Sequence, residues 1–342
     1  MSDERQRLAD RRPALEARAR ILSAVRRWFE AQGFLEVDTP ARVRAPGQEV
    51  HLDALPSGTR WLVTSPEYAM KRLCGAGYER IVSIGKCWRA DERGPHHEPE
   101  FTMLEWYRAD EPLERIARDC EELVRVATEA AGPSVARWPA GHASPGSPPQ
   151  PRAPAFHLPM APFARVTVRE LLARFAGVAL EGDESVAALA QKARAAGVDV
   201  GTAREWDDVF FQLWLDRVEP RLPELGAAFV FDWPEPLGAL ARRRVDDPRF
   251  VERFELYAGG LELANAFGEL TDPHEQRARF LAETAARAAR GKTVYPLDEA
   301  LLAALATMPP TAGVALGFDR LVMLVLGAGA IRDVVAFADD EV

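Results

Sequence analysis

Apolar residues recur at helical spacing in several long stretches of the chain. Between residues 14 and 32 they lie three or four positions apart, with basic residues between them, and Gly33 follows directly. This spacing puts the apolar side chains on one face of a helix, and a glycine just beyond is typical of a helix end. The same reasoning predicts helices that begin at Ser65–Pro66, Arg115 and Asp272, a helical and polar region up to about Leu222, and a last helix after Gly317.

Short apolar and β-branched runs between turn residues predict the strands. They lie at residues 34–40, 60–64, 79–88 and 228–234, in the segment 96–110, and on either side of Gly259–Gly260 within residues 253–270. A loop of charge and glycine, residues 91–99, joins two of these strands into a hairpin with a long tip. Because neighbouring strands are joined by hairpins and helices cluster between groups of strands, the sequence predicts an α+β fold: a mostly antiparallel sheet flanked by helices.

The strand within HHEPEFTMLEWYRAD, residues 96–110, has an unusual pattern of polarity. A strand buried on both faces is nearly continuous in apolar residues, and a half-exposed strand alternates apolar and polar residues. This segment does neither, because a carboxylate, Glu105, lies between Leu104 and Trp106. Such a carboxylate needs a cation or hydrogen-bond donors if it is buried. Every second side chain shares a face, so one face carries Phe101, Met103, Glu105 and Tyr107, and the other carries Glu100, Thr102, Leu104 and Trp106.

Composition and charge place the chain among soluble globular proteins. Of its 342 residues, 47% are hydrophobic and 28% are charged, and the net charge of −9 argues against a broad nucleic-acid-binding surface. We expect one domain over residues 1–342, interrupted by a surface insertion rich in Pro, Gly and Ala at about residues 132–159. The three widely spaced cysteines fit a reducing compartment without a disulfide framework.

The sequence also argues against a secretory or membrane protein. The N-terminus is charged from its second residue onward, so no signal peptide is expected. The most apolar stretch, residues 313–331, contains Asp319 and Arg320, a pair that would be costly within a membrane. We therefore expect a cytoplasmic protein that does not contact a membrane.

Candidate chemistry lies near the ends of the predicted strands. Arg89 and Arg320 are permanent cations whose planar guanidinium groups suit phosphate. Carboxylates on adjacent strands, at Glu255, Glu262 and Glu269, are a plausible seat for Mg²⁺ bound to a nucleotide. Glu262 and Glu269 would share a face only if a bulge near Asn265 or Gly268 corrects their odd spacing. Taken singly, each of these residues is more simply explained as part of a solvated salt bridge.

Familiar phosphate-binding and nucleophile motifs are absent from the sequence. It contains no P-loop, no GxGxxG after a strand and no GxSxG. His96–His97 lacks a nearby third ligand, so a metal centre there is disfavoured. Phosphate chemistry in this chain must therefore use arginines and a metal held by carboxylates.

Three segments carry a family resemblance. GFLEVDTP, WRADERGPHHEPEFTMLEWY and GVALGFDRL resemble the three signature motifs of class II aminoacyl-tRNA synthetases, in the same order. TSPEYAMKRL, HHEPEFTMLEWYRAD and GLELANAFGELTD are similar to the lysyl branch of that class. The resemblance implies a class II synthetase-like catalytic domain, covering residues 14–337 apart from the Pro-rich insertion.

The segment before the first motif is short, because this motif starts at Gly33. Lysyl-tRNA synthetases carry an anticodon-binding domain there, so none is expected in this chain. A stand-alone core resembles the elongation factor P–(R)-β-lysine ligase family, which attaches (R)-β-lysine to a lysine of that translation factor. Ala315 also resembles these ligases, since the synthetases usually have glycine there. The resemblance implies elongation factor P as acceptor, lysine or (R)-β-lysine as substrate, no tRNA, and a homodimer.

The resemblance implies two chemical steps and a set of site residues. The amino acid carboxylate attacks the α-phosphate of ATP, and an acceptor amine then displaces AMP. Arg89 and Arg320 would be catalytic, holding the α- and γ-phosphates, and Glu255 and Glu262 would hold Mg²⁺. ATP would contact Arg89, Asp91, Glu92, His97, Glu98, Phe101, Glu262, Leu263, Gly317 and Arg320, and the diamino acid would contact Ser65, Pro66, Glu67, Glu105, Tyr107, Asn265, Glu269 and Ala315.

Two departures from the family pattern leave alternatives open. Arg89-Ala90-Asp91-Glu92 replaces the usual Arg-Asn-Glu, so either Asp91 or Glu92 could contact adenine. Glu98 replaces an asparagine and would need a metal or an arginine, such as Arg93, beside a phosphate. The same chemistry with another acceptor, a tRNA or a free amine, also remains open, as does a catalytically silent paralogue that acts as a binding module. The presence of both arginines and all the glutamates argues against a silent paralogue.

Overall fold

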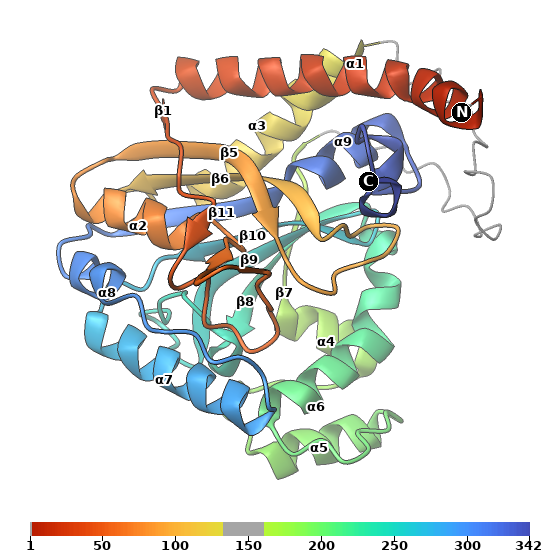
Figure 1. Cartoon of the computed structure of the whole chain (residues 1–342). Helices are drawn as coiled ribbons and strands as arrows, with labels where there is room; N and C mark the ends of the chain where they lie inside the picture. The colour runs from red at the N-terminus through yellow and green to blue at the C-terminus, as the bar shows by residue number, and fades with distance from the viewer. Residues whose placement is uncertain (1, 133–160) are drawn as a thin grey trace.

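The computed structural model describes residues 2–132 and 161–342 and contains an eight-stranded sheet (Figure 1). The inner strand pairs are antiparallel, and the pairs at the two edges, β1 with β5 and β7 with β8, are parallel. The expected mostly antiparallel sheet is confirmed. The expected insertion at about residues 132–159 lies, except for Gly132, outside the described residues. The order across the sheet is β1 (Leu35–Glu36), β5 (Arg80–Trp88), β6 (Glu100–Ala109), β11 (Thr311–Gly317), β10 (Leu261–Gly268), β9 (Phe250–Ala258), β8 (Ala227–Pro234) and β7 (Ala164–Thr167).

Helices pack on both faces of this sheet (Figure 1). A three-stranded sheet, in the order β2 (Arg42–Val43), β4 (Arg60–Leu62) and β3 (Pro56–Ser57), lies beside the large one. The helices are α1 (Ser2–Ala31), α2 (Glu67–Gly75), α3 (Leu113–Ala131), α4 (Val168–Ala176), α5 (Val186–Ala195), α6 (Trp206–Leu213), α7 (Pro273–Ala289), α8 (Glu299–Leu305) and α9 (Phe318–Leu326). Shorter turns of 3₁₀ or π helix occupy Trp214–Val218, Glu219–Leu225, Glu235–Leu237, Ile331–Asp333 and Asp339–Glu341.

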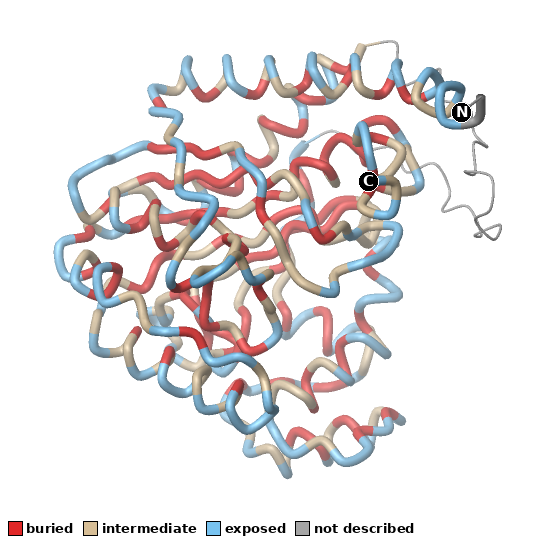
Figure 2. Tube along the Cα trace, in the orientation of Figure 1, coloured by how far each residue is buried: buried red, intermediate tan, exposed pale blue. Residues whose placement is uncertain are grey.

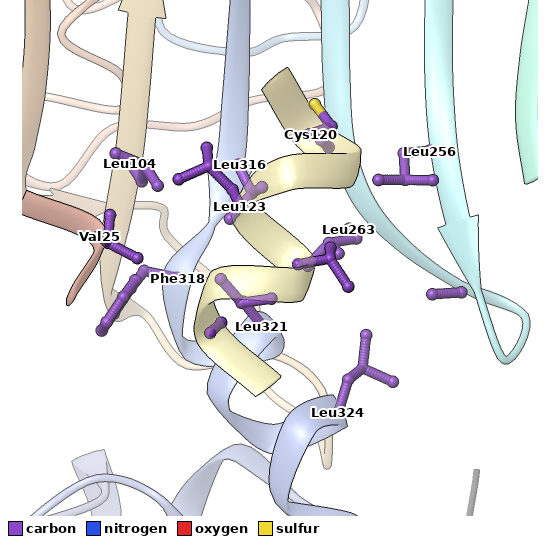
Figure 3. Close-up of a cluster of buried hydrophobic side chains, with 14 of the residues drawn as sticks. Val25, Leu104, Cys120, Leu123, Leu256, Leu263, Leu316, Phe318, Leu321 and Leu324 are labelled. Atoms are coloured by element: carbon purple, nitrogen blue, oxygen red, sulfur yellow. The ribbon is translucent and has the colours of Figure 1, made fainter. Parts of the chain in front are cut away.

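The main core lies between the sheet and the helices α1, α3 and α9 (Figure 3). Leu104 and Trp106 of β6 belong to it and are fully buried. The rings of Trp106 and Phe29 meet edge to face with centroids 5.4 Å apart. Figure 2 shows the central strands buried along most of their length, while α1 exposes one side. Within the described ranges, no helix combines the length and the apolar character needed to cross a membrane.

A second hydrophobic cluster covers the opposite face of the sheet. Tyr107 of β6 packs there with residues from α2, α7 and α8, including Tyr68, Phe280 and Leu301. The two faces of β6 therefore meet different environments, as its alternating pattern predicts. Even-numbered side chains enter the core, and odd-numbered side chains from Met103 to Tyr107 face the second layer.

The structure contains elements that the pattern of the sequence did not predict. Strand β7 is short and largely exposed, and it forms by pairing with β8 rather than by burying an apolar face of its own. Helix α8 is also additional; its N-cap Asp298 accepts hydrogen bonds from the backbone of Ala300 and Leu301. The region up to Leu222 is helical as predicted, but describing it as polar is wrong. It carries a third core, which includes Phe210 and Trp214.

The expected bulge in β10 exists, but it lies earlier than predicted. The register with β9 shifts between Glu262 and Ala264, so Leu263 and Ala264 both enter the main core. The sequence argument placed the bulge near Asn265 or Gly268, because it could not show which residue the core would take. The bulge still has the expected effect. It adds one residue to the strand, so Glu262 and Glu269, which are seven positions apart, can share one face of the sheet.

The aromatic residues at the end of α1 are core residues. Phe29 and Phe34 are 2% and 8% exposed, and their rings meet edge to face at 5.0 Å. The indole N–H of Trp28 donates to Glu122 Oε2 at 3.1 Å. Core packing therefore accounts for Phe29 and Phe34, and a hydrogen bond to α3 accounts for the orientation of Trp28.

A buried charge cluster joins β6 to α3. Arg108 donates to both oxygens of Asp119, from Nε at 2.6 Å and Nη2 at 3.1 Å. Trp106 Nε1 donates to the same carboxylate at 3.2 Å, and Arg115 Nη2 lies 2.9 Å from it. Asp119 is 0% exposed and Arg108 is 2% exposed, so each group depends on the other for its charge balance.

Asp119→Ala should destabilise the fold strongly, because it leaves the Arg108 guanidinium buried without a counter-charge. We expect a loss of about 3–5 kcal/mol in the free energy of unfolding, measured by urea denaturation with circular dichroism. Glu129→Ala, which removes the exposed pair with Arg125, is the control and should cost less than about 1 kcal/mol. Equal, small losses in both variants would contradict the assignment.

Candidate active site

A row of carboxylates lies on the face of the sheet that is turned away from the main core. Glu105, near the middle of β6, is 1% exposed. Its two oxygens accept hydrogen bonds from Ser65 Oγ and from the Tyr107 hydroxyl, each at 2.7 Å. Ser65 also accepts from the Glu67 backbone N–H at 3.1 Å, so the start of α2 is tied to β6. The structure thus brings together the predicted substrate residues Ser65, Pro66, Glu67, Glu105 and Tyr107.

A buried lysine that the sequence analysis did not single out neutralises part of this cluster. The Lys71 ammonium lies 2.6 Å from Glu67 Oε1 and 2.6 Å from Glu269 Oε2. Lys71 and Glu269 are each 1% exposed. A signal was available, because Glu67 and Lys71 are four positions apart at the start of a predicted helix, the spacing of an intrahelical ion pair.

The cluster holds more negative charge than its own cation can balance. Burial, together with the charge of Glu67, raises the pKa of Glu105 to about 8. Burial likewise raises the pKa of Glu269 to about 8, although Lys71 opposes the shift. Burial alone would lower the pKa of Lys71, but the two carboxylates hold it above its usual value. Such a pocket favours a positively charged ligand.

Close backbone packing lets two of these side chains meet. A Cβ on Gly313 of β11 would lie 2.4 Å from the Tyr107 ring and 2.5 Å from Glu269 Oε1. Any other residue at this position would therefore push Tyr107 and Glu269 out of place. The sequence analysis had no reason to single out this glycine, because the need for it arises from side chains on two other elements.

Asn265 and Ala315 complete the amino-acid side of the site. They are opposite each other in the β10–β11 pairing, and Ala315 is also opposite Glu105. Asn265 Oδ1 accepts from Arg253 Nε at 3.2 Å. Ala315 packs against the small apolar cluster that contains Met103. The predicted diamino acid residues therefore converge on adjacent strands.

Arg89 and Phe101 lie together at the far end of β6. The guanidinium carbon of Arg89 is 5.2 Å from the centroid of the Phe101 ring. Arg89 Nη1 lies 3.6 Å from Glu92 Oε1, whereas Asp91 is exposed and has a φ of +62°. Of the two residues proposed for adenine contact, Glu92 is thus the one that faces Arg89.

Arg320 of α9 connects the 91–99 loop to the bulge in β10. It donates to His96 O at 3.2 Å and to Glu262 O at 2.7 Å, and its Nη2 lies 2.7 Å from His97 Nε2. Burial lowers the pKa of His97, and the charge of Arg320 lowers it further. A neutral His97 can accept from the guanidinium through Nε2. A Cβ on Gly317 would lie 3.4 Å from Arg320 Cδ, an ordinary contact, so this arginine does not by itself require a glycine there.

Glu98 faces the C-terminal segment of the chain. Its Oε2 accepts from the Asp339 backbone N–H at 3.1 Å, and burial raises the pKa of Glu98. Arg93, expected as a partner for Glu98, instead forms an ion pair with Asp339. The expected placement of Arg93 is therefore not met, because the C-terminal residues, distant in sequence, supply an alternative carboxylate.

Glu255 and Glu262, the predicted metal ligands, differ in their surroundings. Glu255 accepts from Arg253 Nη2 and from the Tyr257 hydroxyl. Burial, together with the charge of Glu262, raises the pKa of Glu255 to about 7. The Glu262 carboxylate has no hydrogen bond or ion pair with another described residue, and the described part of the chain shows no group of three metal-ligating side chains. These two carboxylates repel each other, so a divalent cation suits this place electrostatically.

Comparisons with known proteins agree with this geometry. Residues 5–341 match the family of class II tRNA synthetases (D, K and N). The chain is 37% identical to the elongation factor P–(R)-beta-lysine ligase of Klebsiella pneumoniae over 96% of each chain. It is 39% identical to the protein of that name from Erwinia tasmaniensis, over 95% of this chain and 94% of the relative. It is 38% identical to the lysine–tRNA ligase of Anaeromyxobacter sp. (strain K), over 95% of this chain but 65% of that longer protein.

The family profile and the relatives of matching length lead to the same assignment, and the observed sheet is the one that the class II resemblance implied. The chain belongs to the class II tRNA synthetase family (D, K and N) and, within it, to the group of elongation factor P–(R)-beta-lysine ligases.

Proposed function

We propose that this protein is an ATP-dependent ligase that adenylates lysine or (R)-β-lysine and transfers it to a lysine side chain of elongation factor P. The names of its relatives of matching length support this acceptor. The observation that carries the proposal is the excess of buried carboxylates around Lys71. Glu67, Glu105 and Glu269 share one internal ammonium, so the pocket is completed by a ligand with further positive charge.

The two ends of the site suit the two ends of an aminoacyl-adenylate. Carboxylates gather around Glu105 and Tyr107, and Arg89 lies against the Phe101 ring. At about 3.3 Å per residue, the strand from Phe101 to Tyr107 is about 20 Å long, comparable to an extended lysyl-adenylate. Phe101 would stack on adenine, and the face of β6 would form the floor of the site.

Arg89 and Arg320 would perform the catalytic work at the phosphates. The substrate carboxylate attacks the α-phosphorus, pyrophosphate leaves, and charge develops on the phosphate oxygens. Fixed guanidinium groups stabilise this charge, and binding both reactants in one site removes the entropic cost of their encounter. Glu262, whose carboxylate has no internal partner, would hold Mg²⁺ with Glu255 beside it, and the ion would neutralise phosphate charge.

We further propose a single catalytic domain over residues 1–342 that carries the insertion, acts as a cytoplasmic homodimer and does not use a tRNA. The net charge of −9 supports a protein acceptor over a tRNA. Transfer to tRNA is the second candidate, because a lysine–tRNA ligase matches the chain at 38% identity.

The choice of acceptor can be tested directly. With ATP, Mg²⁺ and labelled (R)-β-lysine, we expect the label to appear on purified elongation factor P and not on lysine tRNA. Elongation factor P whose acceptor lysine is changed to arginine is the matched control and should stay unlabelled. Label on tRNA alone would favour the second candidate.

The two ends of the site should respond differently to substitution. Glu269→Gln should raise the KM for the diamino acid about 10- to 100-fold, because a hydrogen bond to a charged group is lost, with little change in the KM for ATP. Arg320→Ala should lower ATP–pyrophosphate exchange about 10³-fold, since phosphate charge is left unbalanced. Arg332→Ala, which removes an arginine paired with Asp340, is the control for charge and should exchange normally. An equal loss for both ligands in Glu269→Gln would contradict its role.

Binding of the diamino acid should release protons. The pKa values of Glu105 and Glu269 are raised to about 8, so at neutral pH these carboxyls are mostly protonated in the free protein. A dication favours their ionised forms, so affinity should increase as the pH rises through neutrality toward 8. Titration calorimetry in buffers of different ionisation enthalpy measures the release, which Glu105→Gln should reduce and the exposed Glu129→Gln should not. Proton uptake on binding would refute this account.

A further inference from the structure

A partly open cavity of about 180 Å³ borders the active site on the side of α7. It lies between Gln48–Glu49, the segment 235–240 and one face of α7. None of the residues proposed above for ATP or the diamino acid lines it. Its size would accommodate several water molecules or the end of an alkyl chain.

The cavity shares two walls with the diamino acid pocket. Phe280 of α7 lines the cavity and packs against Tyr68, with ring centroids 5.5 Å apart. Tyr68 is the neighbour of Glu67 on α2. Leu240 lines the cavity as well, and the next residue, Ala241, pairs with Glu269 of the pocket. These shared neighbours place the cavity beside the pocket of Glu67 and Glu269.

The cavity contains a buried amide group without partners. Gln276 is 1% exposed, and neither its Nε2 nor its Oε1 has a hydrogen-bond partner. By contrast, the neighbouring amide of Gln48 has a hydrogen bond at each end. Its Nε2 donates to Pro296 O at 3.0 Å, and its Oε1 accepts from Thr284 Oγ1 at 3.2 Å. Buried side-chain amides are nearly always hydrogen-bonded, so the unpartnered Gln276 indicates that a polar ligand completes this place.

Glu49 places a carboxylate in the same wall. It forms no ion pair and accepts no hydrogen bond from another described residue. Its Oε2 lies against Gly47, where a Cβ would be 2.7 Å away. Two other carboxylates line the cavity: Glu283 accepts from the Val50 backbone N–H at 2.7 Å, and Glu235 accepts from Arg243 Nη2 at 2.7 Å. Glu49 is thus the free anionic group of the cavity.

We propose that this cavity receives the side-chain amine of the acceptor lysine and that Glu49 is the base that deprotonates it for attack on the aminoacyl-adenylate. This inference rests on the proposed function. It adds to that function a route for the acceptor and a catalytic group for the second step.

The position of Glu49 fits this role. In the proposed complex, the adenylate carbonyl lies between the α-phosphate at Arg89 and the substrate amine near Glu67. A Cβ on Gly47 would lie 2.7 Å from Glu49 Oε2 and 3.3 Å from Thr64 Oγ1, and the Thr64 carbonyl accepts from Arg89 Nε at 3.5 Å. Glu49 therefore lies one segment away from Arg89.

The acidity of Glu49 suits proton transfer. Burial raises its pKa to about 7. The charges of Glu67 from α2 and Glu283 from α7 contribute to this shift, while the Glu49 backbone N–H and Arg89 oppose it. A lysine ammonium has a pKa of about 10.4, so a carboxylate near 7 is a better base toward it than an ordinary glutamate.

The second step transfers the acyl group from the adenylate to the acceptor nitrogen. The Glu49 carboxylate takes one proton from the acceptor ammonium, and the neutral nitrogen attacks the adenylate carbonyl carbon. The bond from that carbon to the phosphate oxygen breaks, its electron pair leaves with AMP, and the phosphate carries away the second proton of the nitrogen. An amide remains, and Glu49 returns its proton to solvent through the cavity.

Single-turnover transfer tests the inference. With adenylate formed in advance from ATP, Mg²⁺ and (R)-β-lysine, Glu49→Gln should transfer to elongation factor P about 10²-fold more slowly than the wild type. Hydroxylamine, an amine that is neutral at pH 7, needs no base, so it should trap the adenylate of both proteins at similar rates. The wild-type transfer rate should rise with pH and level off above about 7, once Glu49 is ionised, whereas the rate of Glu49→Gln should continue to rise toward the pKa of the acceptor lysine, about 10.4.

Two further variants distinguish a base from a general effect on the cavity. Glu283→Gln removes the same charge from the same cavity and should transfer nearly as fast as the wild type. Gln276→Leu should raise the KM for elongation factor P more than it lowers kcat. Normal transfer by Glu49→Gln, or an equal loss of hydroxylamine trapping, overturns the assignment. If the wild type gives no hydroxylamine-trapped adenylate with lysine or (R)-β-lysine, the proposed function fails and the inference falls with it.

Discussion

The structure depends on one strand that buries apolar side chains on one face and a carboxylate on the other. Leu104 and Trp106 hold β6 in the main core, while Glu105 requires donors on the opposite face. Ser65 and Tyr107 provide those donors, so the start of α2 is fixed against the sheet. The apolar face of β6 supplies the stability, and this stability lets the other face keep a buried charge.

The buried carboxylates fall into two groups according to whether the chain gives them a cation. Lys71 and Arg253 neutralise part of the charge of Glu269 and Glu255, and these pairs form part of the scaffold. Glu105, Glu262 and Glu49 have no cation of their own among the described residues. Each of the three can therefore bind a different positively charged ligand. Within the proposed function these are the substrate amine, the metal ion and the acceptor amine.

The sequence predicted the sheet and the face of β6 because both follow from local alternation, hairpin turns and recognisable motifs. The residues it missed depend on contacts between distant segments. Gly313 is required only because Tyr107 and Glu269 meet above it, and Arg93 turns to Asp339 from the other end of the chain. The bulge was anticipated from the spacing of the glutamates, but its place was set by the entry of Leu263 into the core. Lys71 is the exception, since its spacing from Glu67 was visible in the sequence.

Selectivity in such a site follows from the cost of unpaired charge rather than from the shape of the pocket. An amino acid without a second amine would leave Glu105 and Glu269 buried without a counter-charge, or force them to be protonated. A site built to bind a polar group rejects an analogue without it far more strongly than a hydrophobic pocket rejects a missing methylene. Lysine and (R)-β-lysine carry the same charges, so this mechanism does not separate them. Their discrimination must come from the distance between the carboxyl group and the nearer amine, which the proposed function places between Arg89, Glu67 and Ala315.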